Sequence, residues 1–171
     1  MRNTLRRLLA ACIALCILPV TVLAGENVLY SWHPNESKKI AITFDDGPHP
    51  VYTPEILSIL AEYGVRATFF VVGENAEWYP ELVRRELAEG HEIGNHTYSH
   101  ANLRKSGYDT VLTEILDMEN AVYENAEYRC HLLRPPGGLY GDPVCHAAEM
   151  LDYHVILWSI DTRDWAHTPR K

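Results

Sequence analysis

Two short clusters of side chains in this sequence could take part in the same reaction. Asp45 and Asp46 are adjacent carboxylates after one β-rich run, and His96 and His100 stand four positions apart after another. Two carboxylates can divide the work, because one can bind a cation while the other takes a proton from water. Histidines at this spacing on a helix or tight turn project to one side. Two histidines and one aspartate form a three-ligand set that suits catalytic zinc and also accepts cobalt or nickel.

Each cluster also has an ordinary structural interpretation. The stretch Asp45–Asp46–Gly47–Pro48 suits a solvated turn or a helix N-cap. A lone histidine at a strand end is most often an ordinary polar residue. The sequence contains no His-Glu-x-x-His, so the histidine pair does not indicate a zincin protease. The residue types alone therefore leave both a turn and a metal site open.

The segments that must position these clusters alternate between β-rich and amphipathic stretches. Strands are predicted at 39–44, 67–72, 91–94, 132–134 and 154–160, and helices at 54–63, 80–89, 108–125 and 142–151. This alternation predicts an α/β fold with a parallel sheet, whose site lies where the carboxyl ends of the strands meet their loops. About five strands could form an open doubly wound sheet but not a complete eight-stranded barrel.

Four stretches resemble, in order, the motifs of the polysaccharide deacetylases, carbohydrate esterase family four. They are Thr43–Phe44–Asp45–Asp46–Gly47–Pro48, His96–Thr97–Tyr98–Ser99–His100, Arg134–Pro135–Pro136–Gly137 and Asp161–Thr162–Arg163–Asp164–Trp165. They span the chain from about Lys39 to Trp165, so chance similarity is a poor explanation. The resemblance implies a distorted (β/α) barrel with a parallel sheet, here incomplete, and a site at the carboxyl ends of the strands.

The resemblance also implies how the two clusters divide the chemistry. Asp45 would be the general base. A divalent metal, with zinc expected and cobalt or nickel as alternatives, would be bound by Asp46, His96 and His100. Arg134 would hold and tune Asp45 through a charged hydrogen bond, for which a guanidinium is well shaped. Without the other motifs, Arg134 would be interpreted as a surface charge at a Pro-Pro turn.

Three further residues receive roles from the resemblance. The backbone N–H of Gly137 would help to hold the oxyanion, at a position where many relatives carry an aromatic residue. Trp165 would line the acetyl pocket, although alone it would be interpreted as a core aromatic. Asp164 would orient a catalytic histidine. The family's fifth motif, a Leu-x-His that supplies the catalytic acid, has no match here, and His167 lacks the required strand context.

The expected activity is metal-dependent hydrolysis of N-acetyl groups on a cell-wall polysaccharide. Peptidoglycan N-acetylglucosamine is the first expected substrate, with chitooligosaccharide and acetylxylan as alternatives. The missing acid suggests a fragment or a truncated product, because general acid catalysis contributes about 10²–10⁴ in rate. The alternative is a weak or inactive remnant that binds metal and carbohydrate.

The first 24 of the 171 residues predict export. Arg2, Arg6 and Arg7 precede an apolar run that ends at a small-residue cleavage signal, as in a signal peptide, and the run is short for a membrane span. Cleavage would leave a catalytic domain at 25–171, secreted or associated with the cell wall, and would move the formal net charge from -8 to -11. This acidic balance argues against nucleic-acid binding. An oxidising location would permit a disulfide between Cys130 and Cys145, with free buried thiols as the alternative.

Overall fold

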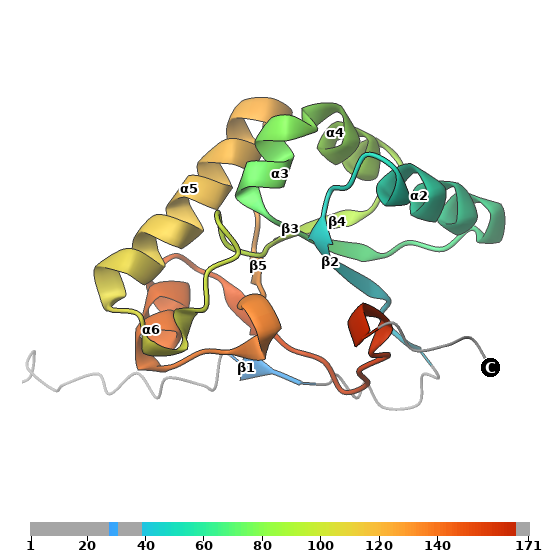
Figure 1. Ribbon diagram of the computed structural model, residues 1–171. Coiled ribbons are helices and arrows are strands. Elements are labelled where there is room, and N and C mark those ends of the chain that lie inside the picture. The colour runs from blue at the N-terminus through green and yellow to red at the C-terminus, as the bar shows by residue number, and fades with distance from the viewer. Residues whose placement is uncertain (1–27, 31–38, 167–171) are drawn as a thin grey trace, which may run out of the picture.

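Short strands and helices alternate along the part of the chain that the computed structural model describes, residues 28–30 and 39–166 (Figure 1). The strands are β1 (Val28–Leu29), β2 (Thr43–Gly47), β3 (Thr68–Val71), β4 (Glu92–Asn95), β5 (Leu132–Leu133) and β6 (His154–Ile156). The α-helices are α2 (Tyr52–Tyr63), α3 (Gly73–Trp78), α4 (Pro80–Ala88), α5 (Tyr108–Ala126) and α6 (Asp142–Met150). Three short 3₁₀ turns complete the order: η1 (Leu103–Lys105), η2 (Pro136–Gly138) and η3 (Asp164–Ala166).

Within the described residues the strands form one six-stranded sheet in the order β1-β6-β5-β4-β3-β2. Every neighbouring pair is parallel, and the sheet stays open, with β1 and β2 at its two edges. The predicted α/β fold with a parallel, incompletely closed sheet is thus confirmed. Because all strands run the same way, their carboxyl ends meet at one edge, and the loops that follow them are brought together there.

The helices pack where their apolar faces meet the sheet and one another. In α5 the inward face consists of residues spaced three and four apart, namely Val111, Ile115, Met118 and Val122, all fully buried. Helices α3 and α4 lie beside α5 over the sheet (Figure 1). Helix α2 ends where the sequence predicts, at Gly64, whose φ of 63° is the left-handed conformation that glycine adopts readily.

Several predicted boundaries are wrong in informative ways. Strand β2 starts at Thr43 and continues through Gly47, so it includes the aspartates that were expected in the following turn. Strand β1 was not predicted, since two residues carry too little pattern to detect. Strand β6 is shorter than predicted, because it ends at Ile156 and not at Ile160.

Helix α3 was also missed, because it opens with glycine, which disfavours helix. The glycine at this position is required by packing. A Cβ on Gly73 would lie 2.5 Å from Tyr98 Cδ2 and 3.1 Å from the Cα of Met118. The absence of a side chain therefore lets α3 approach α5 and the loop after β4 closely.

Two predictions about the cellular setting meet the structure only in part. Cys130 is buried, Cys145 is half-buried, and both are free thiols, so the disulfide alternative is not formed. Among the described residues, no helix is both long and apolar enough to span a bilayer. The predicted signal peptide at 1–24 lies outside the described residues.

Candidate metal and catalytic site

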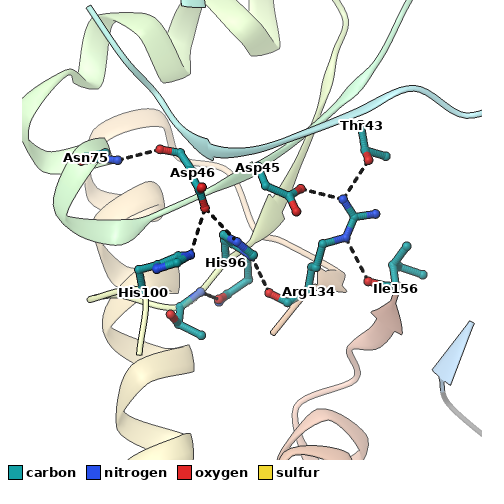
Figure 2. A network of polar contacts seen from close by, with 10 residues as sticks. Thr43, Asp45, Asp46, Asn75, His96, His100, Arg134 and Ile156 are labelled. Atoms are coloured by element: carbon teal, nitrogen blue, oxygen red, sulfur yellow. Dashed lines mark hydrogen bonds and ion pairs between the residues drawn. The ribbon is translucent and has the colours of Figure 1, made fainter. Parts of the chain in front are cut away.

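The two aspartates of β2 reach the site through an irregularity in the strand. In a regular strand adjacent side chains point to opposite faces, which would separate Asp45 from Asp46. Here the register shifts, so that Asp45 pairs with Phe70 and Gly47 with Val71. Asp46 is left between them with a φ of 66°. This bulge brings both carboxylates to the same end of the sheet, as Figure 2 shows.

The predicted histidine pair comes together on a loop and not on a helix. Strand β4 ends at Asn95, and the next residues turn through left-handed conformations at Thr97 (φ 68°) and His100 (φ 58°). Asp46 Oδ1 lies 3.2 Å from His96 Nε2 and 3.0 Å from His100 Nε2. One donor atom from each of these three residues lies within 4.8 Å of the other two. The structure therefore brings together the three residues that the sequence proposes as metal ligands (Figure 2).

The orientation of His96 shows what kind of partner this cluster needs. Its Nδ1 lies 2.6 Å from the backbone O of Arg134, and a carbonyl can only accept, so Nδ1 carries the hydrogen. In the neutral ring, Nε2 then points a lone pair at the Asp46 carboxylate. Two atoms that both carry lone pairs, 3.2 Å apart, require a positive charge between them, either a second ring proton or a metal cation.

The distances and exposure of the cluster fit a divalent cation. Tetrahedral zinc with bonds of about 2.0–2.2 Å holds its ligand atoms about 3.3–3.6 Å apart, slightly more than the 3.2 and 3.0 Å from Asp46 to the two histidines. The side chain of His96 is 2% exposed, whereas those of His100 and Asp46 are 47% and 67% exposed. The hydrogen bond with His96 lowers the pKa of Asp46, against burial, which raises it. An ionised carboxylate and two imidazoles, open to solvent on one side, are a suitable donor set for such a cation.

The second predicted element of the site is the ion pair between Arg134 and Asp45. Arg134 Nη1 donates to Asp45 Oδ1 at 2.6 Å and to Thr43 Oγ1 at 2.8 Å. Nε and Nη2 donate to the backbone O of Ile156 and of Leu157, each at 3.1 Å. The side chain of Arg134 is only 3% exposed, so its interpretation as a surface charge is wrong.

Burial gives this pair its electrostatic character. Desolvation lowers the pKa of Arg134, while the charge of Asp45 raises it. The guanidinium also lies over the ring of Phe70, with Cζ 3.9 Å from the centroid. Asp45 is 31% exposed at its side chain, and within the described part of the chain its Oδ2 accepts no hydrogen bond. One oxygen of Asp45 is thus fixed and the other is available to accept a proton.

The remaining predicted residues lie in the loops that follow β5 and β6. Gly137 in η2 has a φ of 62°, a conformation that favours glycine. Trp165 in η3 is 70% exposed, so it is not a core residue, and Arg163 Cζ lies 5.8 Å from its ring centroid. The side chain of Asp164 and all of His167 lie outside the described residues. The roles assigned to these residues remain predictions.

The structure adds residues that the sequence did not indicate. Asn75 Nδ2 donates to the backbone O of Asp46 at 2.9 Å and so supports its left-handed conformation. Thr43 belongs to the first motif, but its contact with Arg134 was not predicted. Asn75 lies in the unpredicted helix α3, so no sequence signal could have placed it. Thr43 and Arg134 are 91 positions apart in the sequence, so no local pattern indicates their hydrogen bond.

Comparison with known proteins gives this geometry a family. The profile described as "Polysaccharide deacetylase" matches residues 33–156, which is most of the chain. The chain belongs to the polysaccharide deacetylase family. The family recognised from the four ordered motifs is therefore confirmed.

Two proteins similar to this chain are named as deacetylases. A peptidoglycan-N-acetylglucosamine deacetylase of Bacillus cereus is 45% identical over 136 residues, which cover 78% of this chain and 63% of that protein. A chitooligosaccharide deacetylase of Sinorhizobium fredii is 41% identical over 128 residues, which cover 74% of this chain and 60% of that protein. The chain thus spans less than two thirds of the length of either relative.

A solved structure agrees with the fold. The crystal structure of a peptidoglycan N-acetylglucosamine deacetylase superposes with a TM-score of 0.80 at 38% identity, covering 88% of this chain and 70% of that one. The neighbour supports the same parallel β/α architecture for this family member.

Proposed function

We propose that this chain carries a metal-dependent N-deacetylase site for a cell-wall polysaccharide. The observation that carries the proposal is the convergence of two units at one end of the sheet. Asp46, His96 and His100 form a donor set that requires a positive charge, and beside it Asp45 is held by Arg134 with one oxygen free. Hydrolysis of an acetamide needs both an electrophilic centre and a base beside it.

Each residue would have a distinct task in the reaction. A divalent cation at this site, zinc first and cobalt or nickel as alternatives, would supply Lewis acidity toward the acetyl carbonyl and lower the pKa of water. The free oxygen of Asp45 would take the proton of the attacking water. Arg134 would hold Asp45 in place through their hydrogen bond and ion pair.

The loops after β5 and β6 would complete the acyl site. The backbone N–H of Gly137 would stabilise the negative charge on the former carbonyl oxygen. Trp165 would line the acetyl pocket, and Asp164 would orient a histidine that protonates the leaving nitrogen. Water then adds to the acetyl carbon, the carbon–nitrogen bond breaks, and acetate and a free amine are released.

The substrate is proposed from the relatives. Peptidoglycan N-acetylglucosamine is the first candidate, since the Bacillus cereus relative bears that name. Chitooligosaccharide is the next, from the name of the Sinorhizobium fredii relative, and acetylxylan a further alternative. An extracytoplasmic location after cleavage of a signal peptide at 1–24, with residues 25–171 as the catalytic domain, belongs to the same proposal.

The test is release of acetate from the full chain with added zinc or cobalt. Peptidoglycan, chitooligosaccharide and acetylxylan are compared as substrates, with Asp45→Asn and His96→Ala as controls. Acetate release that depends on both residues supports the proposal. Equal release by wild type and either variant would overturn the assigned roles, and zinc and sugar binding without any acetate would show a binding remnant.

A further inference from the structure

The loop that carries His96 and His100 is held in an unfavourable backbone conformation. Thr97 and His100 both have positive φ; histidine adopts it more readily than most residues, whereas for the β-branched Thr97 it is a clear outlier. Such conformations persist only where the surrounding contacts determine them. The loop after β4 is therefore held by specific partners on its two sides.

One side of the loop is held by the start of α3. The N–H of Gly73 donates to the backbone O of Thr97, and the N–H of Glu74 donates to the backbone O of Tyr98, each at 3.0 Å. These bonds satisfy two carbonyls of the loop. They leave its amide groups, which face the opposite way, to be satisfied by other partners.

The other side is held mainly by one carboxylate on α5. Oε2 of Glu114 accepts the N–H groups of Tyr98 at 3.0 Å and of Ser99 at 2.9 Å. Its Oε1 accepts the Ser99 hydroxyl at 2.6 Å. Asn95 Oδ1 accepts the amide of Thr97 at 2.9 Å. Glu114 thus binds the two residues that immediately precede His100.

The two histidines differ in how far they depend on this support. His96 is buried, and its ring is fixed independently by the bond from Nδ1 to the O of Arg134. The side chain of His100 is 47% exposed, and among the described residues Asp46 is its only polar partner. The position of the His100 ring is therefore set chiefly by the backbone that Glu114 holds.

We infer that Glu114 is a positioning residue, which fixes the loop so that His100 completes the donor set. The inference rests on the proposed metal site but not on turnover. A carboxylate accepts all three hydrogen bonds, whereas alanine accepts none of them; glutamine could still accept the two amides and donate its NH₂ group to the Ser99 hydroxyl, so it would not remove the support. The change Glu114→Ala should therefore displace the loop and weaken metal binding through His100.

The experiment compares the zinc affinity of four full-length proteins by competition with a chromophoric chelator. Glu114→Ala should bind zinc about 10–100-fold more weakly, as for other groups that orient metal ligands, and should change the visible spectrum of the cobalt-loaded protein. Ser99→Ala, which removes only the hydroxyl bond, should show a smaller loss. Glu77→Ala is the matched control, because Glu77 accepts only the exposed Tyr98 hydroxyl and its removal should leave both readouts unchanged.

The outcomes distinguish a role of Glu114 in positioning His100 from a role in stability alone, and they test the proposed function separately. Wild-type zinc affinity and cobalt spectrum in Glu114→Ala would overturn the inference, even if the melting temperature fell. If that variant does not fold, Glu114→Asp and Ser99→Ala decide, and unchanged zinc affinity in both would overturn it. A wild type that binds zinc but releases no acetate overturns the proposed function alone. A wild type that binds no divalent cation overturns both.

Discussion

The two carboxylates of β2 are adjacent in sequence but have electrostatically different partners. Asp45 pairs with Arg134, a permanent cation that is 3% exposed and is also bonded to Thr43 and two backbone carbonyls. Asp46 faces two imidazoles, whose positive charge depends on a proton or a metal. The protein alone completes the environment of the proposed base, whereas the donor set around Asp46 needs a cation from outside. Substitutions in the Asp45–Arg134 pair and in the donor set around Asp46 should therefore have separable effects on catalysis and on metal binding.

Removal of a proposed ligand should give the largest effect. We expect His96→Ala to weaken zinc binding more than about 100-fold, since the loss of a ligand should exceed the loss of a group that orients one. Acetate release should fall to background. Zinc competition is the measurement, with His131→Ala as the control, because His131 is exposed. Retained zinc affinity in His96→Ala would contradict the donor set.

Removal of the proposed base should lower the rate of acetate release without changing zinc affinity. Asp45→Asn keeps the size of the side chain but cannot accept the proton, so the rate of acetate release should fall by about 10²–10⁴. Zinc affinity should stay near the wild-type value, because in the described part of the chain the Asp45 carboxylate makes no hydrogen bond or ion pair with the donor set. A parallel loss of zinc affinity would show that the two halves are not separable.

Loss of the buried cation should be seen first in stability. Arg134→Met leaves Asp45 without its charged partner and removes four hydrogen bonds, which should lower the free energy of unfolding by about 3 kcal/mol. Urea denaturation measures this loss. Zinc affinity should fall less than in His96→Ala, because the backbone O that orients His96 remains. An unchanged unfolding midpoint would contradict this account of the pair.

Within the described residues, the buried carboxylate of Glu86 has no charged partner, unlike the buried Arg134, which is paired with Asp45. Glu86 in α4 is 0% exposed, neither of its oxygens has a hydrogen-bond partner among the described residues, and burial raises its pKa from 4.5 to about 8. The folded protein therefore holds this proton between these values, whereas the unfolded chain releases it. The contribution of Glu86 to stability should be fullest below about pH 4.5 and should fall as pH rises toward about 8, by at most about 1.4 kcal/mol per unit.

The variant Glu86→Gln tests this dependence. Gln cannot ionise, so the fall in the free energy of unfolding between about pH 5 and 8 should become shallower than in the wild type. Urea denaturation at several pH values is the measurement, and Glu77→Gln, at an exposed position of α3, should keep the wild-type slope. Equal slopes for wild type and Glu86→Gln would show that Glu86 is not the group responsible.

The elements with strong local patterns were predictable. The apolar spacing of α5, the proline that opens α4 and the glycine that ends α2 all act within one or two turns of chain, so the sequence shows them directly. Strand β1 and helix α3 were missed because they are short and their contacts are with distant residues. The pairing of β1 with β6 joins residues near opposite ends of the described chain.

The sequence by itself determined which residues could do chemistry and in which family to look for their roles. It could not decide that two adjacent aspartates would face one site, because that depends on a bulge set by pairing with β3 and on Asn75. The family resemblance implied the contact of Arg134 with Asp45, 89 positions away, but no local pattern indicated that Arg134 would be buried or that Glu114 would hold the histidine loop. Local propensities act between neighbours, whereas these contacts exist only after the sheet has brought distant segments together.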